Sequence, residues 1–426
     1  MNHFTEMAEN QIITVLFKGI EIGKLGFDVH KNQSTFQFNP SYLSSGKYDK
    51  LFPYIFKRTN QVQVFSNYSG ETFRSLPPMI TDSLPDYFGN IIFKEWLESA
   101  HRDFNKISIL EQLTYVANRG MGALEYQPVK ELPINQVFSI HEITEVLREV
   151  LQLKSVANQT KMNEAALLNI FRIGTSAGGA RPKILVSEHK NTHEIIPGDI
   201  EFSADYNHYL VKLNLENSER LNREIIEYIY YELAISIGIT MMPSKLIDDK
   251  HFATLRFDRV NGEKKHVLTV SGLTGWDFKK IEHASYENIF RLAIDLGIEN
   301  KELNQLFKRM VFNVVFANTD DHLKNFSFIY DDVKNQWNLA PAYDLTYPLN
   351  PLINYTRISR VLSINGKRQD ISRKDLLQLA DDFSIKSPNY IIEEVINLIP
   401  SFKEKCIQHK VPLSIIARIE SDFLRI

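Results

Sequence analysis

Three oxygen-bearing side chains in the last third of the chain have the types and spacing that phosphoryl transfer needs. Asp320 lies in the run ANTDDHLKNFSF at 317–328, and Asn325 follows it five residues later. Asp344 comes 19 residues after Asn325, within APAYDLTY at 340–347. Phosphoryl transfer needs a carboxylate that accepts a hydroxyl proton and hard oxygen ligands that hold Mg²⁺ against the phosphates. The pattern predicts Asp320 as the base, Asn325 and Asp344 as Mg²⁺ ligands, and ATP as the phosphate donor.

The acid–amide spacing also has a purely structural explanation, an Asx-rich turn between a helix and a strand. A glycine-rich segment upstream, GTSAGGARPK at 174–183, favours the chemical interpretation. Glycines allow backbone N–H groups to approach phosphate oxygens closely. The segment is neither a Walker A sequence nor the Gly-x-Gly-x-x-Gly of protein kinases, so a plain glycine turn remains open as an alternative.

A lysine inside an apolar strand is the second upstream feature. Lys212 lies in YLVKL at 209–213, and burying its charge is costly unless an anion pairs with it. Protein kinases use such a lysine to bind the α- and β-phosphates, braced by a glutamate on the following helix. Glu227 occupies that position here, with Glu224 as the alternative. A lysine at a sheet edge that reaches solvent is the alternative explanation of Lys212.

The surrounding periodicity predicts the elements that position these residues. A hairpin is expected at 12–17 and 22–27, strands at 183–187 and 208–213, and a second hairpin at 326–330 and 336–339. An amphipathic helix is expected over 220–237, and a capping box at Ser139 and Glu142 predicts another from 139 to about 153. A β-rich part followed by a helix-rich part favours a two-lobed α+β enzyme over a doubly wound sheet.

At these residues the sequence resembles the HipA family of bacterial toxin kinases, over nearly the whole chain. The most specific stretches are SAGGARPK (176–183), ANTDDHLKN (317–325) and LAPAYDL (339–345). Supporting similarities are LPDYFG (84–89), GMGAL (120–124), LAISIGITMMPS (233–244), LRFDR (255–259) and SGLT (271–274). The resemblance implies a two-lobed protein-kinase-like α+β fold. We expect a small β-rich N-terminal subdomain at 1–127, an ATP-binding lobe at 139–260 and a helical C-terminal lobe with the catalytic and metal-binding loops at 261–426.

Carried over position by position, the resemblance gives Asp320 as base and Asn325 and Asp344 as Mg²⁺ ligands, and it identifies Ser176 as the autophosphorylated serine. Glu227 would support Lys212 through an ion pair. The implied nucleotide-binding set comprises the glycine-rich loop, two lysines, an adenine hinge and a histidine: Ala177, Gly178, Gly179, Ala180, Arg181, Lys183, Lys212, Arg256, Phe257 and His322.

The resemblance further implies a Ser/Thr protein kinase of the toxin type, with aminoacyl-tRNA synthetases among the family's targets and a HipB-like helix-turn-helix antitoxin as partner. Two departures stand out. Arg181-Pro182 replaces the Gln-Glu of other members, and Asp321 directly follows the proposed base, so a shared base role remains open. The chain lacks the His-Arg-Asp, Asp-Phe-Gly and Ala-Pro-Glu sequences of ordinary kinases, so activation-loop control is not expected.

Composition sets further bounds. The net charge of −3, from 49 basic and 52 acidic residues, gives no global field that attracts DNA, so we expect DNA contact only through the antitoxin. The single cysteine, the absence of a signal-peptide pattern and the lack of a run of roughly 20 apolar residues predict a cytoplasmic protein without membrane contact. Two alternatives to a protein kinase stay open: a small-molecule or lipid phosphotransferase, and a non-catalytic co-repressor.

Overall fold

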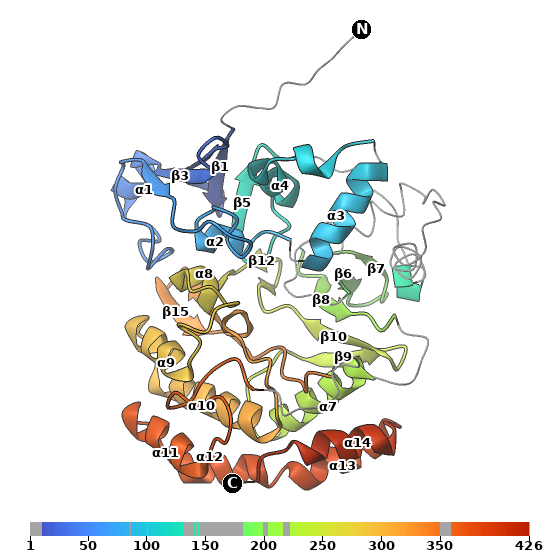
Figure 1. Cartoon of the computed structure of the whole chain (residues 1–426). Helices are drawn as coiled ribbons and strands as arrows, with labels where there is room; N and C mark the ends of the chain where they lie inside the picture. The colour runs from blue at the N-terminus through green and yellow to red at the C-terminus, as the bar shows by residue number, and fades with distance from the viewer. Residues whose placement is uncertain are drawn as a thin grey trace. The chain divides into compact units, whose positions relative to one another are not determined.

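The computed structural model describes residues 11–85, 87–99, 101–130, 140–141, 143–144, 182–198, 203–215, 222–349 and 359–425 (Figure 1). The chain forms two compact units. The first comprises 1–215, 258–268 and 272–275, and the second comprises 216–257, 269–271 and 276–426. The helix expected from 139 to 153 lies almost wholly outside the described residues. That helix and the three predicted domain boundaries stay predictions.

The first unit begins with an antiparallel sheet of order β4-β3-β2-β1-β5 (Figure 1). Its strands are β1 (Ile12–Phe17), β2 (Ile20–Asp28), β3 (Gln33–Phe38), β4 (Gln63–Phe65) and β5 (Leu124–Gln127). The predicted hairpin is confirmed. Lys18 and Gly19 form its two-residue turn with φ values of 49° and 73°, the left-handed pair that a type I′ turn requires. This turn places Phe17 opposite Ile20 and sets the register.

One face of this sheet carries a cluster of rings, here called the aromatic cluster. The ring of Phe36 lies 5.0 Å from that of Phe38 and 4.5 Å from that of Phe56. Phe52 and His266 extend the cluster, with their ring centroids 6.1 Å apart. Because these side chains are buried, they form the core of this part of the molecule. The cluster consists of Phe17, Phe36, Phe38, Phe52, Phe56, Phe65 and His266.

Two of the short sequence motifs meet within the first unit. The Gly122 amide donates to the Asp258 carboxylate at 2.9 Å. Arg259 donates to the carbonyl oxygens of Gly122 at 2.9 Å and Gly120 at 2.8 Å. GMGAL and LRFDR therefore form one buried polar contact, and the glycines expose the backbone groups that the acid and the guanidinium bind.

The SGLT segment has its glycine for a steric reason. A Cβ on Gly272 would lie 2.0 Å from the Asp82 carboxylate, so no other residue fits without movement. Asp82 directly follows α2 (Pro78–Thr81), the short helix before the LPDYFG segment. The helices of the first unit are α1 (Pro40–Ser45), α2, α3 (Tyr87–Ser99) and α4 (Ile109–Val116), with the 3-10 turn η1 (Phe104–Lys106).

A second group of strands in the first unit carries the predicted lysines. β6 (Lys183–His189) pairs antiparallel with β7 (Ile195–Pro197) on one side and β8 (Tyr206–Lys212) on the other. The small hairpin β11 (Arg259–Val260) and β12 (Glu263–Lys264) follows later in the chain. The strands predicted at 183–187 and 208–213 are confirmed, and their pairing fixes which side chains lie opposite one another.

The second unit is mainly helical and carries the segment that contains Asp320, Asn325 and Asp344. The predicted helix is α7 (Arg223–Ser236), and the predicted hairpin is β14 (Ser327–Asp331) with β15 (Gln336–Leu339). Figure 1 shows α11 to α14, in red, gathered at one end of this unit. Its other described elements are β9 (Ser244–Ile247), β10 (His251–Leu255), α9 (Tyr286–Asp295), α10 (Asn300–Val315), η2 (Leu323–Asn325), α11 (Arg373–Asp382), α12 (Pro388–Ile396), α13 (Ile399–Gln408) and α14 (Leu413–Ser421). The residues of β13 (His266–Thr269) and of α8 (Val270–Thr274) are divided between the two units.

Throughout the described ranges, every helix is too short or too polar to cross a bilayer.

Candidate active site

The loop between α10 and β14 positions the proposed base. Asp320 is exposed there, and its backbone carbonyl accepts hydrogen bonds from the His322 amide at 3.0 Å and the Asn325 side-chain amide at 2.8 Å. The spacing of five residues between Asp320 and Asn325 thus has a structural cause, because the 3-10 turn η2 brings the Asn325 side chain back to the Asp320 carbonyl. With its NH₂ group bound in this way, Asn325 keeps its carbonyl oxygen as a ligand for a hard cation.

Asp344 is connected to the same loop by a buried amide. The Asn318 side chain donates to the Asp344 backbone carbonyl at 3.2 Å. Asp344 is half-buried and has a φ of 53°, a left-handed conformation that costs a non-glycine residue of order 1–3 kcal/mol. Residues in such conformations cluster at active sites, where the surrounding structure holds them. The structure therefore places Asp320 and Asn325 on one loop and ties the segment that carries Asp344 to that loop through Asn318.

Asp321 has an environment unlike that of its neighbour. Its side chain is fully buried and accepts hydrogen bonds from the Tyr286 hydroxyl at 2.7 Å, the Arg360 guanidinium at 2.9 Å and the Leu362 amide at 3.2 Å. Burial acts to lower the pKa of Arg360, but the Asp321 carboxylate outweighs it and raises that pKa above its usual value. Because protein donors surround Asp321, we assign it a structural role and not a share in proton transfer.

Aromatic contacts surround the other residues predicted in the second unit. The rings of His322 and Phe278 lie 5.1 Å apart, and the buried Nδ1 of His322 accepts or donates no hydrogen bond to any described residue. Phe257 stacks on Tyr343, the residue before Asp344, at 5.8 Å. Arg256, beside Phe257, is buried. The proposed hinge residue Phe257 is therefore packed against the segment that carries Asp344, the second predicted metal ligand.

The two predicted phosphate-binding lysines are partners in the first unit. Lys183 on β6 lies directly opposite Lys212 on β8, with Lys183 buried and Lys212 half-buried. Directly opposite residues on antiparallel strands have Cβ atoms about 4.5–5.5 Å apart, and like charges there destabilise the pair. Two lysines at the same point of the sheet could both contact the phosphates of one nucleotide, so the pair is compatible with ATP as a ligand. The sequence alone gave no sign of the pairing, because it depends on the register of β6 and β8.

The remaining predicted residues fall into two groups. Glu227 and its alternative Glu224 are both buried on α7 of the second unit. The glycine-rich loop lies outside the described residues, so its predicted roles stay predictions; these concern Ser176, Ala177, Gly178, Gly179, Ala180 and Arg181.

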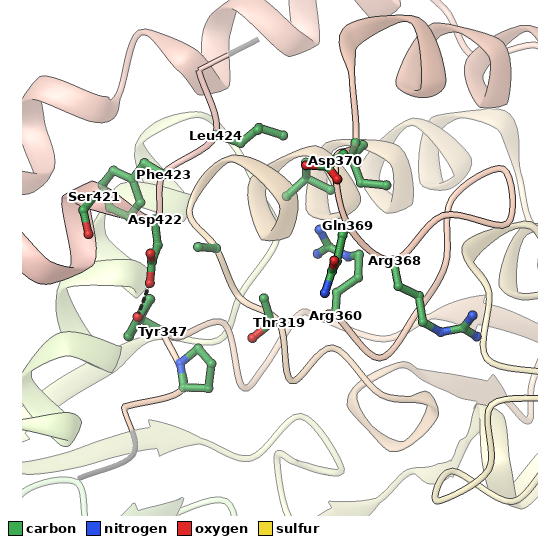
Figure 2. A pocket seen from close by; sticks show the side chains of 14 residues that line it. Thr319, Tyr347, Arg360, Arg368, Gln369, Asp370, Ser421, Asp422, Phe423 and Leu424 are labelled. Atoms are coloured by element: carbon green, nitrogen blue, oxygen red, sulfur yellow. Dashed lines mark hydrogen bonds between the residues drawn. The ribbon is translucent and has the colours of Figure 1, made fainter. Parts of the chain in front are cut away.

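A cavity of about 450 Å³ lies in the second unit beside the start of the catalytic loop (Figure 2). Thr319 and Arg360 line it together with Tyr347, which donates a hydrogen bond to Asp422. The basic residues Lys367 and Arg368 are engaged within the protein, since Lys367 bonds to Asp375 at 2.8 Å and Arg368 binds backbone carbonyls. These contacts favour a structural role for both side chains.

Comparisons with known proteins agree with this architecture. The HipA-like C-terminal domain matches residues 175–402 and the HipA N-terminal domain matches 13–127. A putative kinase of Sinorhizobium fredii, Y4dM, is 30% identical over 131 residues, which are 30% of this chain and 31% of the relative. A putative kinase of Haemophilus influenzae is 24% identical over 266 residues, 54% of this chain and 74% of the relative. The chain thus spans under a third of the first relative's length.

Among solved structures, HipA of Shewanella oneidensis, in a complex with HipB and operator DNA, superposes with a TM-score of 0.63. Its sequence is 16% identical, and the superposition covers 96% of this chain and 95% of that one. This likeness confirms the predicted fold class, a kinase-like α+β fold with a β-rich N-terminal sheet. Because the C-terminal domain match alone spans more than half of the chain, this protein belongs to the HipA family.

Proposed function

We propose that this chain is an ATP- and Mg²⁺-dependent Ser/Thr protein kinase of the HipA toxin type. The observation that most supports the proposal is the pair of hydrogen bonds from Asn325 to the Asp320 carbonyl and from Asn318 to the Asp344 carbonyl. Together they hold an exposed acid and an amide on one loop and connect that loop to the segment that carries a second carboxylate, Asp344. This is the set that phosphoryl transfer requires.

In the proposed reaction, Asp320 accepts the proton of an acceptor Ser or Thr hydroxyl. The hydroxyl oxygen forms a bond to the γ-phosphorus while the bond from that phosphorus to the β–γ bridging oxygen breaks, and ADP leaves with the electron pair. Lys183 and Lys212 would bind the phosphates, and Glu227 would brace Lys212. Asn325 and Asp344 would hold Mg²⁺, which neutralises charge on the phosphate oxygens. His322, Arg256 and Phe257 would contact the nucleoside.

The finer parts of the proposal concern targets and partners. We expect transfer to a protein, with an aminoacyl-tRNA synthetase as the first candidate, and to the chain's own Ser176. The Shewanella HipA structure contains HipB and operator DNA, which supports a HipB-like helix-turn-helix antitoxin as the partner that restrains this chain. The net charge of −3 favours DNA contact through that partner.

The test is intact-mass measurement of the purified chain after incubation with Mg²⁺ and ATP. We expect one added phosphate at Ser176, absent from Ser176→Ala and from Asp320→Asn. Loss of a general base lowers the rate by about 10²–10⁴-fold, and the fold should persist because Asp320 is exposed. Binding of ATP to Asp320→Asn serves as the control for an intact nucleotide site.

Three results would contradict the proposal. Self-phosphorylation of Asp320→Asn within about threefold of the wild-type rate would remove Asp320 from the base role, since a base is worth far more. Phosphorylation of small molecules or lipids without any protein acceptor would indicate the phosphotransferase alternative, and failure to bind ATP would indicate the non-catalytic one.

A further inference from the structure

A buried polar network joins the catalytic loop to the segment that carries Asp344. The Tyr286 hydroxyl donates to Asp321 at 2.7 Å and accepts from the Asn313 amide at 3.1 Å. The Asn318 amide donates to the Asn313 side-chain oxygen at 2.9 Å and to the Asp344 backbone carbonyl at 3.2 Å. A continuous chain of hydrogen bonds therefore runs from the neighbour of the proposed base to the proposed metal ligand.

The segment 360–362 closes this network from another part of the chain. Arg360 donates to Asp321 at 2.9 Å and to the Asn318 carbonyl at 3.2 Å. The Val361 amide donates to the Thr319 carbonyl at 3.0 Å, and the Leu362 amide donates to Asp321 at 3.2 Å. Three consecutive residues thus bind the loop on both sides of Asp320. Asp320 itself keeps its exposed position.

The polar side chains of this network are buried, so each of them needs a hydrogen-bond partner within the protein. The side chains of Tyr286 and Asp321 are fully buried, Asn313 and Asn318 are 2% exposed and Arg360 is 6% exposed. Replacing such an ion pair by apolar residues is often neutral or stabilising, so stability alone gives little reason for it. A satisfied polar network does fix orientation, because each hydrogen bond restricts the angle as well as the distance between two groups.

We propose that Tyr286, Asn313 and Arg360 are positioning residues that hold Asp320 and Asp344 in the relative geometry that phosphoryl transfer requires. The inference rests on the proposed function. Removal of the Tyr286 hydroxyl takes a donor from Asp321 and the acceptor from Asn313 in one step. Asn313 can then rotate, and Asn318 loses the fixed acceptor that orients its bond to the Asp344 carbonyl. The effect therefore reaches both ends of the site, because the chain of hydrogen bonds joins Asp321 to the Asp344 carbonyl through Tyr286, Asn313 and Asn318.

The test compares two buried tyrosines that differ in what their hydroxyls bind. Tyr286→Phe breaks the network. Tyr330→Phe deletes the same atom from a tyrosine that is 1% exposed and bonds to Asn335 in the β14–β15 turn. For Tyr286→Phe we expect kcat to fall about 10- to 100-fold, with the KM for ATP within about threefold of wild type. The Mg²⁺ concentration for half-maximal rate should rise, because Asp344 is held less firmly. Tyr330→Phe should retain the wild-type kcat and Mg²⁺ dependence.

A second readout separates this inference from the proposed function. Amide hydrogen exchange in 317–325 and 342–346 should become faster in Tyr286→Phe and stay unchanged in Tyr330→Phe, whether or not the chain transfers phosphate. Unchanged exchange in Tyr286→Phe would overturn the inference. An active wild type with equal kcat in both variants would overturn it too and leave the proposed function standing. An inactive wild type with faster exchange in Tyr286→Phe would refute the proposed function and support the structural coupling.

Discussion

The aromatic cluster of the first unit and the polar network of the second are both buried, but the cluster consists mainly of apolar rings and the network of polar and charged groups. Ring contacts in the cluster are mostly edge-on or tilted, as between Phe52 and Phe56 at 5.0 Å and 61°. The network instead contains an ion pair, two amides and a phenol. Apolar burial is proportional to area and has no direction, whereas hydrogen bonds are directional. The cluster can therefore stabilise its sheet without fixing the position of any particular atom. The network can fix the positions of particular atoms while adding little net stability.

This difference predicts that damage to the aromatic cluster lowers stability without lowering activity, whereas damage to the polar network lowers both. Aromatic pairs contribute about 0.5–1.5 kcal/mol each beyond area burial, so losing one ring affects mainly the free energy of unfolding. A typical intramolecular hydrogen bond contributes only about 1 kcal/mol net, but a buried group left without its partner costs about 1–3 kcal/mol. Damage to the network should therefore affect both quantities.

The largest effect is expected from Arg360→Met, which leaves the Asp321 carboxylate buried without its cation. Breaking such a pair costs about 3–5 kcal/mol of unfolding free energy. Phosphate transfer by the folded fraction should fall as well. Phe36→Ala in the aromatic cluster is the matched control, since it costs a similar 3–5 kcal/mol by leaving a cavity. Its folded fraction should transfer phosphate at the wild-type rate. Urea unfolding and initial rates corrected for folded fraction give both quantities.

The double variant Asp321→Leu/Arg360→Met sharpens the contrast. Replacing both charges should recover much of the lost stability, because no unpaired charge remains, while transfer stays low. If the double variant regains transfer along with stability, the network acts through stability alone and the contrast between the two regions is wrong.

His266 gives the aromatic cluster its own pH dependence. Burial lowers the pKa of His266 to about 3, so the native state holds the ring neutral, while the unfolded chain binds a proton below about pH 6.5. Stability from the neutral ring is fully present above pH 6.5 and is lost as the pH falls toward 3. Between pH 7 and 4.5 we expect wild type to lose about 2–3 kcal/mol more than His266→Phe. Urea midpoints at the two pH values measure this difference.

Equal acid sensitivity of wild type and His266→Phe would show that His266 is protonated in the folded protein. Comparison at pH 7.5, where the histidine is neutral in both states, isolates the packing effect of the substitution from its effect on titration.

Local patterns in the sequence predicted the parts of the fold that depend on neighbours in the chain. Each of these parts depends on residues close together in the chain: the Lys18-Gly19 turn, the helix Arg223–Ser236, and the spacing from Asp320 to Asn325. The pairings between distant segments were not predictable in this way. The bond of Asp321 to Arg360 links positions 39 residues apart, and periodicity carries no information on such a contact.

Only the structure gives a physical reason for the motifs that supported the resemblance. LRFDR supplies Asp258 and Arg259 to the backbone of GMGAL, and Gly272 leaves room for Asp82. The sequence left open whether Asp321 shares the base role, because adjacent acids look alike in a string of letters. Their burial separates them, since Asp321 is fully buried and Asp320 is exposed.

The smallest effect is expected at Asp375, a buried charged group at the N-terminal end of α11 that serves neither region. Its carboxylate accepts hydrogen bonds from the Ser372 amide at 2.9 Å and from Lys367 at 2.8 Å, and so caps the helix. Burial acts to raise the pKa of Asp375, but Lys367 and Ser372 outweigh it and lower that pKa to about 2. The ionised group therefore adds stability that is fully present above about pH 4 and is lost as the pH falls through 2.

We expect Asp375→Asn to lower the unfolding free energy by about 1–2 kcal/mol at pH 7, and the difference from wild type to shrink to about half at pH 3. The expected loss at pH 7 is smaller than the full pKa shift would imply, because the side chain of Lys367 is 50% exposed and its charge is screened by solvent. Asp381→Asn removes the same charge from an exposed position near the end of α11 and should change stability by less than about 0.5 kcal/mol at either pH. Since Asp375 belongs to neither the network nor the catalytic loop, phosphate transfer at pH 7 should not change. A loss of phosphate transfer in fully folded Asp375→Asn would show that directional polar contacts outside the network also hold the site. The set of positioning residues would then include Asp375.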